Sequence, residues 1–197
     1  MIFVSKPPKP VSGFLHTMLL ALVLVFTSAP AARATPQNII EAEEYEVKAV
    51  YLYNFILFVT WPKKNISASD SFTIGIIGED PFGRSFRDVE GKPIKNTGKK
   101  LAIKRFGPYR DGLDLEACHV LFIAASEQPR FKQIISRIGT APVLTISDTD
   151  TFLDAGGMIN LVKSGSKIRW EINRPALAAA PLRLNSQLYR SAVNIKE

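Results

Sequence analysis

Two short segments near the C-terminus alternate between apolar and polar residues, which is the pattern of β-strands with one buried face. They are residues 158–162 (MINLV) and 167–173 (KIRWEIN). Ser164-Gly165 lies between them and supplies a glycine that tolerates positive φ. The pattern predicts an antiparallel hairpin with a two-residue loop.

The loop position fixes which residues face each other across the hairpin. With Ser164-Gly165 as the loop, Asn160 would lie opposite Arg169 and Met158 opposite Glu171. The face predicted to enter the core carries Ile159, Leu161, Ile168, Trp170 and Ile172. The other face carries Asn160, Arg169, Glu171 and Asn173. From the pattern alone, this polar face is either a half-solvated surface with a weak ion pair or a binding surface.

A long helix is predicted over Glu41 to Val59, which contains no Gly or Pro and ends before Trp61-Pro62. Its apolar residues are spread around more than one face, unlike a single amphipathic stripe. The helix is therefore either buried between layers or uses a second apolar face against a partner or a second subunit. The candidates for such a surface are Tyr51, Phe55 and Phe58.

The rest of the chain alternates between predicted strands and helices. Strands are expected at 72–77, 101–106, 120–124 and 143–146, and helices at 82–89, 130–138, 174–180 and 185–193. This order predicts an α/β fold with a layered mixed sheet of about six strands flanked by helices. The antiparallel hairpin is expected at the edge of the sheet and is followed by helices.

The N-terminus has the features of a cleaved secretory signal peptide. Lys6 and Lys9 precede an apolar run from Phe14 to Phe26, and the small-residue tripeptide of residues 32–34 (ARA) follows. We expect cleavage after Ala34, export from the cytoplasm and a single domain over residues 35–197. Loss of the three cations in the signal peptide lowers the formal charge from +7 to +4.

The remaining positive charge is concentrated between residues 92 and 110. The pattern leaves two interpretations, a solvated loop and strand edge, or a surface attracted to an anionic membrane or an acidic partner.

Nothing in the sequence favours catalysis, a cofactor or a bound metal. Cys118 is the only cysteine, so it can form no intrachain disulfide, and strand alternation sends Cys118 and His119 to opposite faces. Gly75, Gly78 and Gly83 lack the spacing of a dinucleotide-binding loop. No histidine cluster and no Gly-x-Ser-x-Gly motif is present. We therefore expect a protein that is not an enzyme.

Several segments, in their order and spacing, resemble the YfiR family of periplasmic regulatory proteins. They are residues 45–62 (YEVKAVYLYNFILFVTWP), 78–83 (GEDPFG), 118–126 (CHVLFIAAS), 142–148 (PVLTISD), 156–162 (GGMINLV) and 168–173 (IRWEIN). The resemblance implies a small, frequently dimeric periplasmic protein. One member represses an inner-membrane diguanylate cyclase and is sequestered by an outer-membrane OmpA-like lipoprotein, and small aromatic molecules are proposed as its ligands. That member contains disulfides, which this chain cannot form within itself.

The resemblance favours recognition over catalysis as the use of the hairpin's polar face. One hypothesis is a regulator of cyclic-di-GMP synthesis that docks on a membrane partner, with Arg169 as the leading contact because its planar guanidinium suits a carboxylate. The alternative is a small-molecule sensor, or an accessory protein for another membrane sensor or receptor. For the sensor we expect Asn160, Arg169, Glu171 and Asn173 to line a pocket with Trp61, because Trp170 points away from them.

Overall fold

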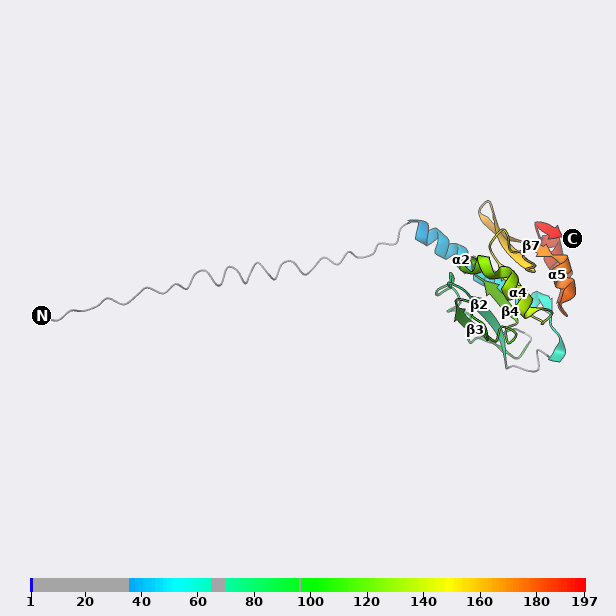
Figure 1. The fold of residues 1–197 in the computed structure, drawn as a ribbon, viewed down its shortest axis with the longest axis horizontal. Helices are drawn as coiled ribbons and strands as arrows, with labels where there is room; N and C mark the ends of the chain where they lie inside the picture. The colour runs from blue at the N-terminus through cyan, green and yellow to red at the C-terminus, as the bar shows by residue number, and fades with distance from the viewer. Residues whose placement is uncertain (2–35, 65–69, 96) are drawn as a thin grey trace. The chain divides into compact units, whose positions relative to one another are not determined.

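The computed structural model describes residue 1 and residues 36–64, 70–95 and 97–197, and the expected signal peptide lies outside them. Residues Pro36–Glu197 form one compact unit. In it, helices and strands alternate along the chain around a mixed sheet (Figure 1). The predicted α/β class is confirmed.

The main sheet has seven strands in the order β3-β2-β4-β5-β6-β7-β9 within the described residues. Their bounds are β2 Ser71–Ile77, β3 Lys100–Gly107, β4 Val120–Ile123, β5 Leu144–Ser147, β6 Ile159–Ser164, β7 Lys167–Asn173 and β9 Asn194–Lys196. Neighbouring strands are parallel except β6 and β7. The hairpin was expected at the edge, and this is wrong because β9 pairs with β7 and takes that place.

A second, two-stranded sheet pairs β1 (Val59–Thr60) with β8 (Arg183–Leu184). Both of its strands, like β9, are too short to show a two-residue periodicity, so the sequence pattern did not predict them.

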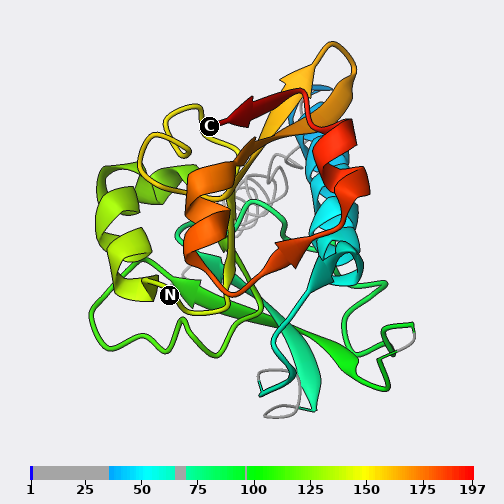
Figure 2. The same ribbon diagram turned by 90° about the vertical axis from the view of Figure 1, so that its right-hand side faces the viewer.

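Helices cover both faces of the main sheet (Figure 2). Their bounds are α2 Pro36–Phe58, the 3-10 helix η1 Ala125–Arg130, α4 Phe131–Ile138, α5 Arg174–Ala179 and α6 Ser186–Ser191. Residues of α2, α5 and α6 share one buried apolar cluster with the strands, and residues of α4 share a second cluster with the opposite face. The sheet is therefore the middle of three layers.

The hairpin register differs from the predicted one by two residues. The loop is Gly165-Ser166, one position later than expected, with φ +60° at Gly165. Asn160 therefore pairs with Glu171 instead of Arg169. Because a shift of two residues preserves alternation, the assignment of side chains to the two faces is unaffected.

The predicted apolar face of the hairpin is confirmed, since all five of its residues belong to the core shared with α2. Trp170 meets the rings of Tyr51 and Phe55 edge to face, with centroids 5.3 and 5.7 Å away. Its indole N–H donates to the Leu188 carbonyl at 3.0 Å. Such aromatic pairs contribute roughly 0.5–1.5 kcal/mol beyond the area they bury, so Trp170 fixes the hairpin against α2.

Three predicted helices have different bounds. The first begins at Pro36 and ends at Phe58, because Val59 joins the ladder of β1. The predicted helix over 130–138 is observed as α4, which begins one residue later and follows a 3-10 segment that contains Pro129. The predicted helix over 185–193 is shorter, with the Asn185 side chain accepting the Gln187 N–H at the N-terminus of α6.

The helix expected over 82–89 is a series of turns. Its hydrogen bonds mostly join residues three apart, as from Ser85 N–H to the Phe82 carbonyl. Gly83 has φ +49°, a conformation that interrupts a right-handed helix at its start.

Cys118 and His119 lie on opposite faces of the sheet, as alternation predicted. Cys118 belongs to the cluster on the α4 side, and burial raises the pKa of its thiol to about 12. On the α2 side, the His119 ring packs 4.5 Å from the Phe72 ring. Burial, with a smaller contribution from Lys99, lowers the pKa of His119 to about 4. The two side chains therefore do not form a nucleophile and base pair.

Candidate functional site: the groove between α2 and the hairpin

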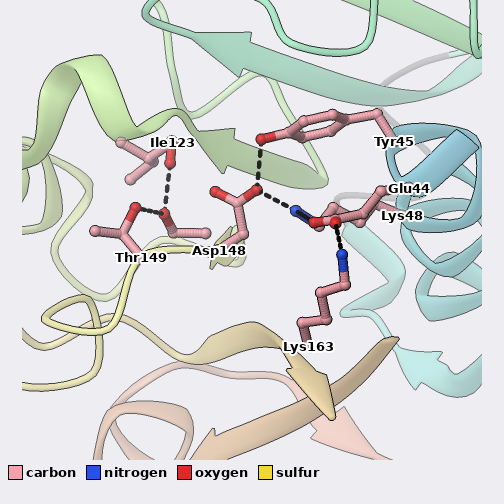
Figure 3. Close-up of polar contacts among 8 residues, drawn as sticks. Glu44, Tyr45, Lys48, Ile123, Asp148, Thr149 and Lys163 are labelled. Carbon is pink, nitrogen blue, oxygen red and sulfur yellow. Dashed lines mark hydrogen bonds and ion pairs between the residues drawn. The ribbon is translucent and has the colours of Figure 1, made fainter. Parts of the chain in front are cut away.

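A group of charges joins the first half of α2 to the end of β5, with Lys48 and Asp148 nearly buried and Lys163 exposed (Figure 3). Lys48 Nζ lies 2.6 Å from Asp148 Oδ2 and 2.6 Å from Glu44 Oε1. Tyr45 OH donates to the same Asp148 oxygen at 2.8 Å, and Lys163 Nζ lies 3.1 Å from Glu44 Oε2. Two cations thus balance two carboxylates, so the group carries little net charge.

This pairing changes the protonation equilibria of its members. Burial opposes ionisation of Glu44, but hydrogen bonds from Lys48 and Lys163 outweigh it and lower the pKa of the carboxyl. Burial, followed by the neighbouring Asp148 carboxylate, raises the pKa of Tyr45 well above its usual value. Tyr45 therefore remains a neutral donor to Asp148, and the group is a fixed structural link.

The turn after β5 is held in place from its other side. Ser147 is buried, and its hydroxyl donates to the Ile123 carbonyl of β4 at 2.7 Å, with Thr149 Oγ1 3.4 Å away (Figure 3). Asp148 thus sits between two anchored neighbours at the carboxyl end of the parallel strands.

A groove of about 570 Å³ lies between the first half of α2 and the hairpin. Ile40, Val47, Tyr51 and Ile168 make its apolar part, and Glu43, Glu44, Lys163, Ser166, Lys167 and Arg169 make its polar part. Ile40 and Val47 are 58% and 45% exposed, values high for large apolar side chains. The groove thus combines apolar and charged lining residues, a composition common in binding sites.

The charges along the groove differ in how they are paired. Glu44 and Lys163 are paired with each other within the group of charges around Lys48. Lys167 and Arg169 are exposed on the hairpin, and neither forms an ion pair or side-chain hydrogen bond with the described residues. The hairpin wall therefore offers two cations to an incoming acidic group.

The residues predicted for the polar face of the hairpin do not form one site. Arg169 is exposed and lines the groove, whereas Glu171 is half-buried and accepts a long hydrogen bond (3.4 Å) from Asn194. Asn173 is buried and caps α5, accepting the Ala176 N–H at 3.1 Å. These contacts give Asn173 a structural role in the fold.

Asn160 is fully buried, beside Ser147 on β5 and Glu171 on β7. Neither polar atom of its side-chain amide has a protein partner within the described residues. It does not line the groove.

Trp61 is separated from the groove, contrary to the expectation that it shares a pocket with Arg169. It is 5% exposed, its indole N–H donates to the Ile56 carbonyl at 3.2 Å, and its ring packs against those of Phe72 and His119. It lines a different hollow of about 520 Å³, beside β1 and β8. Its place after the end of α2 brings it into the core.

The expected partner surface on α2 also needs correction. Phe55 is 1% exposed and packs on Trp170, so it is core, while Phe58 and Tyr51 are half-buried. Among the side chains that the structure describes from residue 40 onwards, the exposed large apolar residues of the helix are Ile40, Val47, Val50 and Leu57. Their spacing of seven, three and seven residues is that of a helix-packing stripe, and this spacing could have identified them in the sequence.

The buried charges were missed because their partners are far apart in the sequence, with Lys48 and Asp148 separated by 100 residues. The only local indication is the i,i+4 spacing of Glu44 and Lys48.

Within the described residues, no group of three or more potential ligands is placed to hold a metal ion. None of the described helices combines the length and apolar character needed to cross a bilayer.

Comparison with known families assigns the class of protein. A family model described as YfiR/HmsC-like matches residues 45–193, which is most of the chain. The chain belongs to this family, and membership indicates a periplasmic regulatory role in cyclic-di-GMP signalling together with membrane proteins. Among curated proteins, no significant match was found.

Proposed function

We propose that the protein is a periplasmic regulator that binds the periplasmic part of an inner-membrane diguanylate cyclase and represses or modulates it. The observation that carries the proposal is the groove, where apolar side chains remain exposed beside two unpaired cations. Burial of this apolar area would stabilise a complex, and Lys167 and Arg169 would select a partner segment with carboxylates. Family membership supplies the cellular setting.

The proposal is tested by measuring binding to the purified periplasmic domain of a diguanylate cyclase encoded beside this protein. We expect saturable binding that weakens in Arg169→Ala and persists in Arg183→Ala, a matched exposed arginine outside the groove. Absence of binding by both the free and the ligand-loaded protein would contradict the proposal.

A small-molecule sensor is a second candidate, favoured by the groove volume of about 570 Å³, which falls in the range of ligand pockets. The Tyr51 ring and the Arg169 guanidinium would suit an aromatic carboxylate. A thermal-shift screen with aromatic amino acids tests this, since a ligand at 100 times its Kd stabilises the fold by roughly 2.7 kcal/mol. A stabilising compound whose effect is lost in Arg169→Ala would support the sensor, and a flat screen would eliminate it.

Other partners implied by the family are kept as proposals. An OmpA-like outer-membrane lipoprotein would compete with the cyclase for the protein, and a second copy of the chain would use the exposed stripe of α2.

A further inference from the structure

The most basic part of the protein lies far from the groove residues, along the edge strand β3 and the turn before it. Residues 91–107 contain six cations and no acidic residue. The cations are Lys92, Lys95, Lys99, Lys100, Lys104 and Arg105. Residues 35–197 together have a net charge of only +4, so the residues of this range outside 91–107 are slightly acidic. The charge is thus strongly localised.

The fold presents these residues on a small projecting hairpin. Pro93 and Lys100 form an antiparallel bridge, and Leu101 N–H donates to the Lys92 carbonyl at 3.0 Å. Ile94, 2% exposed, anchors the turn in the core. Lys92 and Lys100 are therefore held beside each other at the start of β3.

Most of these cations are available to an external partner. Lys92, Lys95 and Lys100 are exposed, and no ion pair or side-chain hydrogen bond joins them to the described residues. Lys104 is also exposed and lies over the Phe106 ring, 4.8 Å from its centroid. Arg105 pairs with Asp80 at 2.8 Å, so it contributes less.

We infer that this basic edge, defined by Lys92, Lys95, Lys100 and Lys104, binds the surface of a membrane containing anionic phospholipids. Within the described residues, β3 is the last strand of the main sheet, with β2 on one side and only the short turn of residues 91–94 bonded along the start of its other side, so this edge can approach a flat surface. Lysine ammonium groups act as point charges without a fixed geometry, which suits an array of mobile phosphate head groups. An acidic peptide would more often be recognised by the planar fork of arginine.

This inference does not depend on the groove. Lipid binding would place the protein at the membrane surface, where a membrane partner is also found. It would therefore raise the concentration of the protein near that partner.

The test is vesicle co-sedimentation of the protein purified from periplasmic extracts, so that the cell has removed the predicted signal peptide. Vesicles of phosphatidylglycerol and phosphatidylethanolamine are compared with phosphatidylcholine vesicles, at low and high salt. The variant Lys92→Ala/Lys95→Ala/Lys100→Ala is compared with Lys132→Ala/Arg183→Ala/Arg190→Ala, which removes three exposed cations elsewhere.

We expect binding only to the anionic vesicles, weakened by salt. The edge variant should lose roughly a hundredfold in affinity, since each lysine near an anionic surface contributes about fivefold. The control variant should bind nearly as the parent protein does.

Equal loss in both variants would mean that net charge alone is responsible, and would overturn the inference. Absence of binding to anionic vesicles at low salt would overturn it as well. If soluble polyglutamate bound the edge while the vesicles did not, the surface would belong to an acidic protein partner instead.

Discussion

The groove and the basic edge contrast in how they use charge. Beside the groove, Lys48 and Lys163 are neutralised by two carboxylates, and exposed apolar side chains contribute to the surface. At the basic edge, three exposed lysines have no ion-pair partner among the described residues, and no acidic residue lies within 91–107. The groove is therefore suited to short-range recognition by shape, and the basic edge is suited to long-range attraction by charge.

The largest expected effect concerns the stability of the groove wall. Lys48→Ala leaves Asp148 without its ion-pair partner in a nearly buried site. Loss of one member of such a pair typically costs about 3 to 4 kcal/mol, which lowers Tm by roughly 10 °C in a protein of this size. Thermal unfolding followed by circular dichroism measures the change.

A double variant serves as the control for this prediction. Lys48→Met with Asp148→Asn removes both charges and keeps an acceptor for Tyr45, so it should cost less than Lys48→Ala. If the double variant were the less stable of the two, Asp148 would stabilise the fold through more than its pairing with Lys48, and the charge-pair account would be contradicted.

Next in size is the effect of a charge introduced among the apolar residues of the groove. Val47→Glu should weaken partner binding at least a hundredfold, about 3 kcal/mol, because docking would bury an unpaired carboxylate. Val47 is 45% exposed, so the fold should tolerate the change, and Val193→Glu is a matched control at 47% exposure outside the groove. Isothermal titration calorimetry with the cyclase domain would measure both, and equal affinities would remove the groove as the docking site.

Acid sensitivity probes the region next to the basic edge, where burial, with a smaller contribution from Lys99, lowers the pKa of His119 from 6.5 to about 4. As pH falls, His119 is protonated in the unfolded chain before it is protonated in the folded protein. The stability that neutral His119 contributes is therefore fully present above pH 6.5 and is lost as pH falls towards 4. Between about pH 7.5 and pH 5 the loss should reach about 2 kcal/mol.

Denaturant titrations at the two pH values measure this loss, with His119→Gln as the comparison. The substitution should leave a flatter pH dependence, to which Glu44 contributes only at lower pH because its lowered pKa preserves its charge. An unchanged slope would show that His119 is not the group responsible.

The smallest predicted effect belongs to Arg169. Arg169→Ala should reduce partner affinity about tenfold, the loss expected for one charge-assisted hydrogen bond at an exposed position. Surface plasmon resonance at low and high salt measures it, and Lys92→Ala at the basic edge should change affinity for the isolated soluble domain much less. A larger loss of affinity in Lys92→Ala than in Arg169→Ala would place the partner at the basic edge.

Sequence periodicity predicted the parts of this structure that repeat over several residues. The apolar face of the hairpin and the opposite placement of Cys118 and His119 follow from alternation. The hairpin register and β9 could not be obtained this way, because they depend on one turn residue and on a three-residue strand. For a related reason, the burial of Asn173 and Phe55 was not predicted. In the sequence, a residue that caps a helix or packs in the core cannot be distinguished from a surface residue, because its neighbours in space are not known.

The groove itself combines segments more than 100 residues apart, so its composition could not be predicted from local pattern. Of the predicted site residues, Arg169 and Tyr51 line it, while Trp61 does not. Its stabilising charges, Lys48 and Asp148, are brought together only by the packing of α2 on the sheet.

Hydrogen–deuterium exchange of the protein, free and bound to the periplasmic domain of the cyclase, tests the central claim most directly. The account predicts slower exchange in residues 40–51 of α2 and in residues 163–169 of the hairpin, with residues 91–107 unchanged in the absence of lipid. Protection confined to residues 91–107, or to the hollow beside β1 and β8, would contradict the assignment of the groove as the docking site.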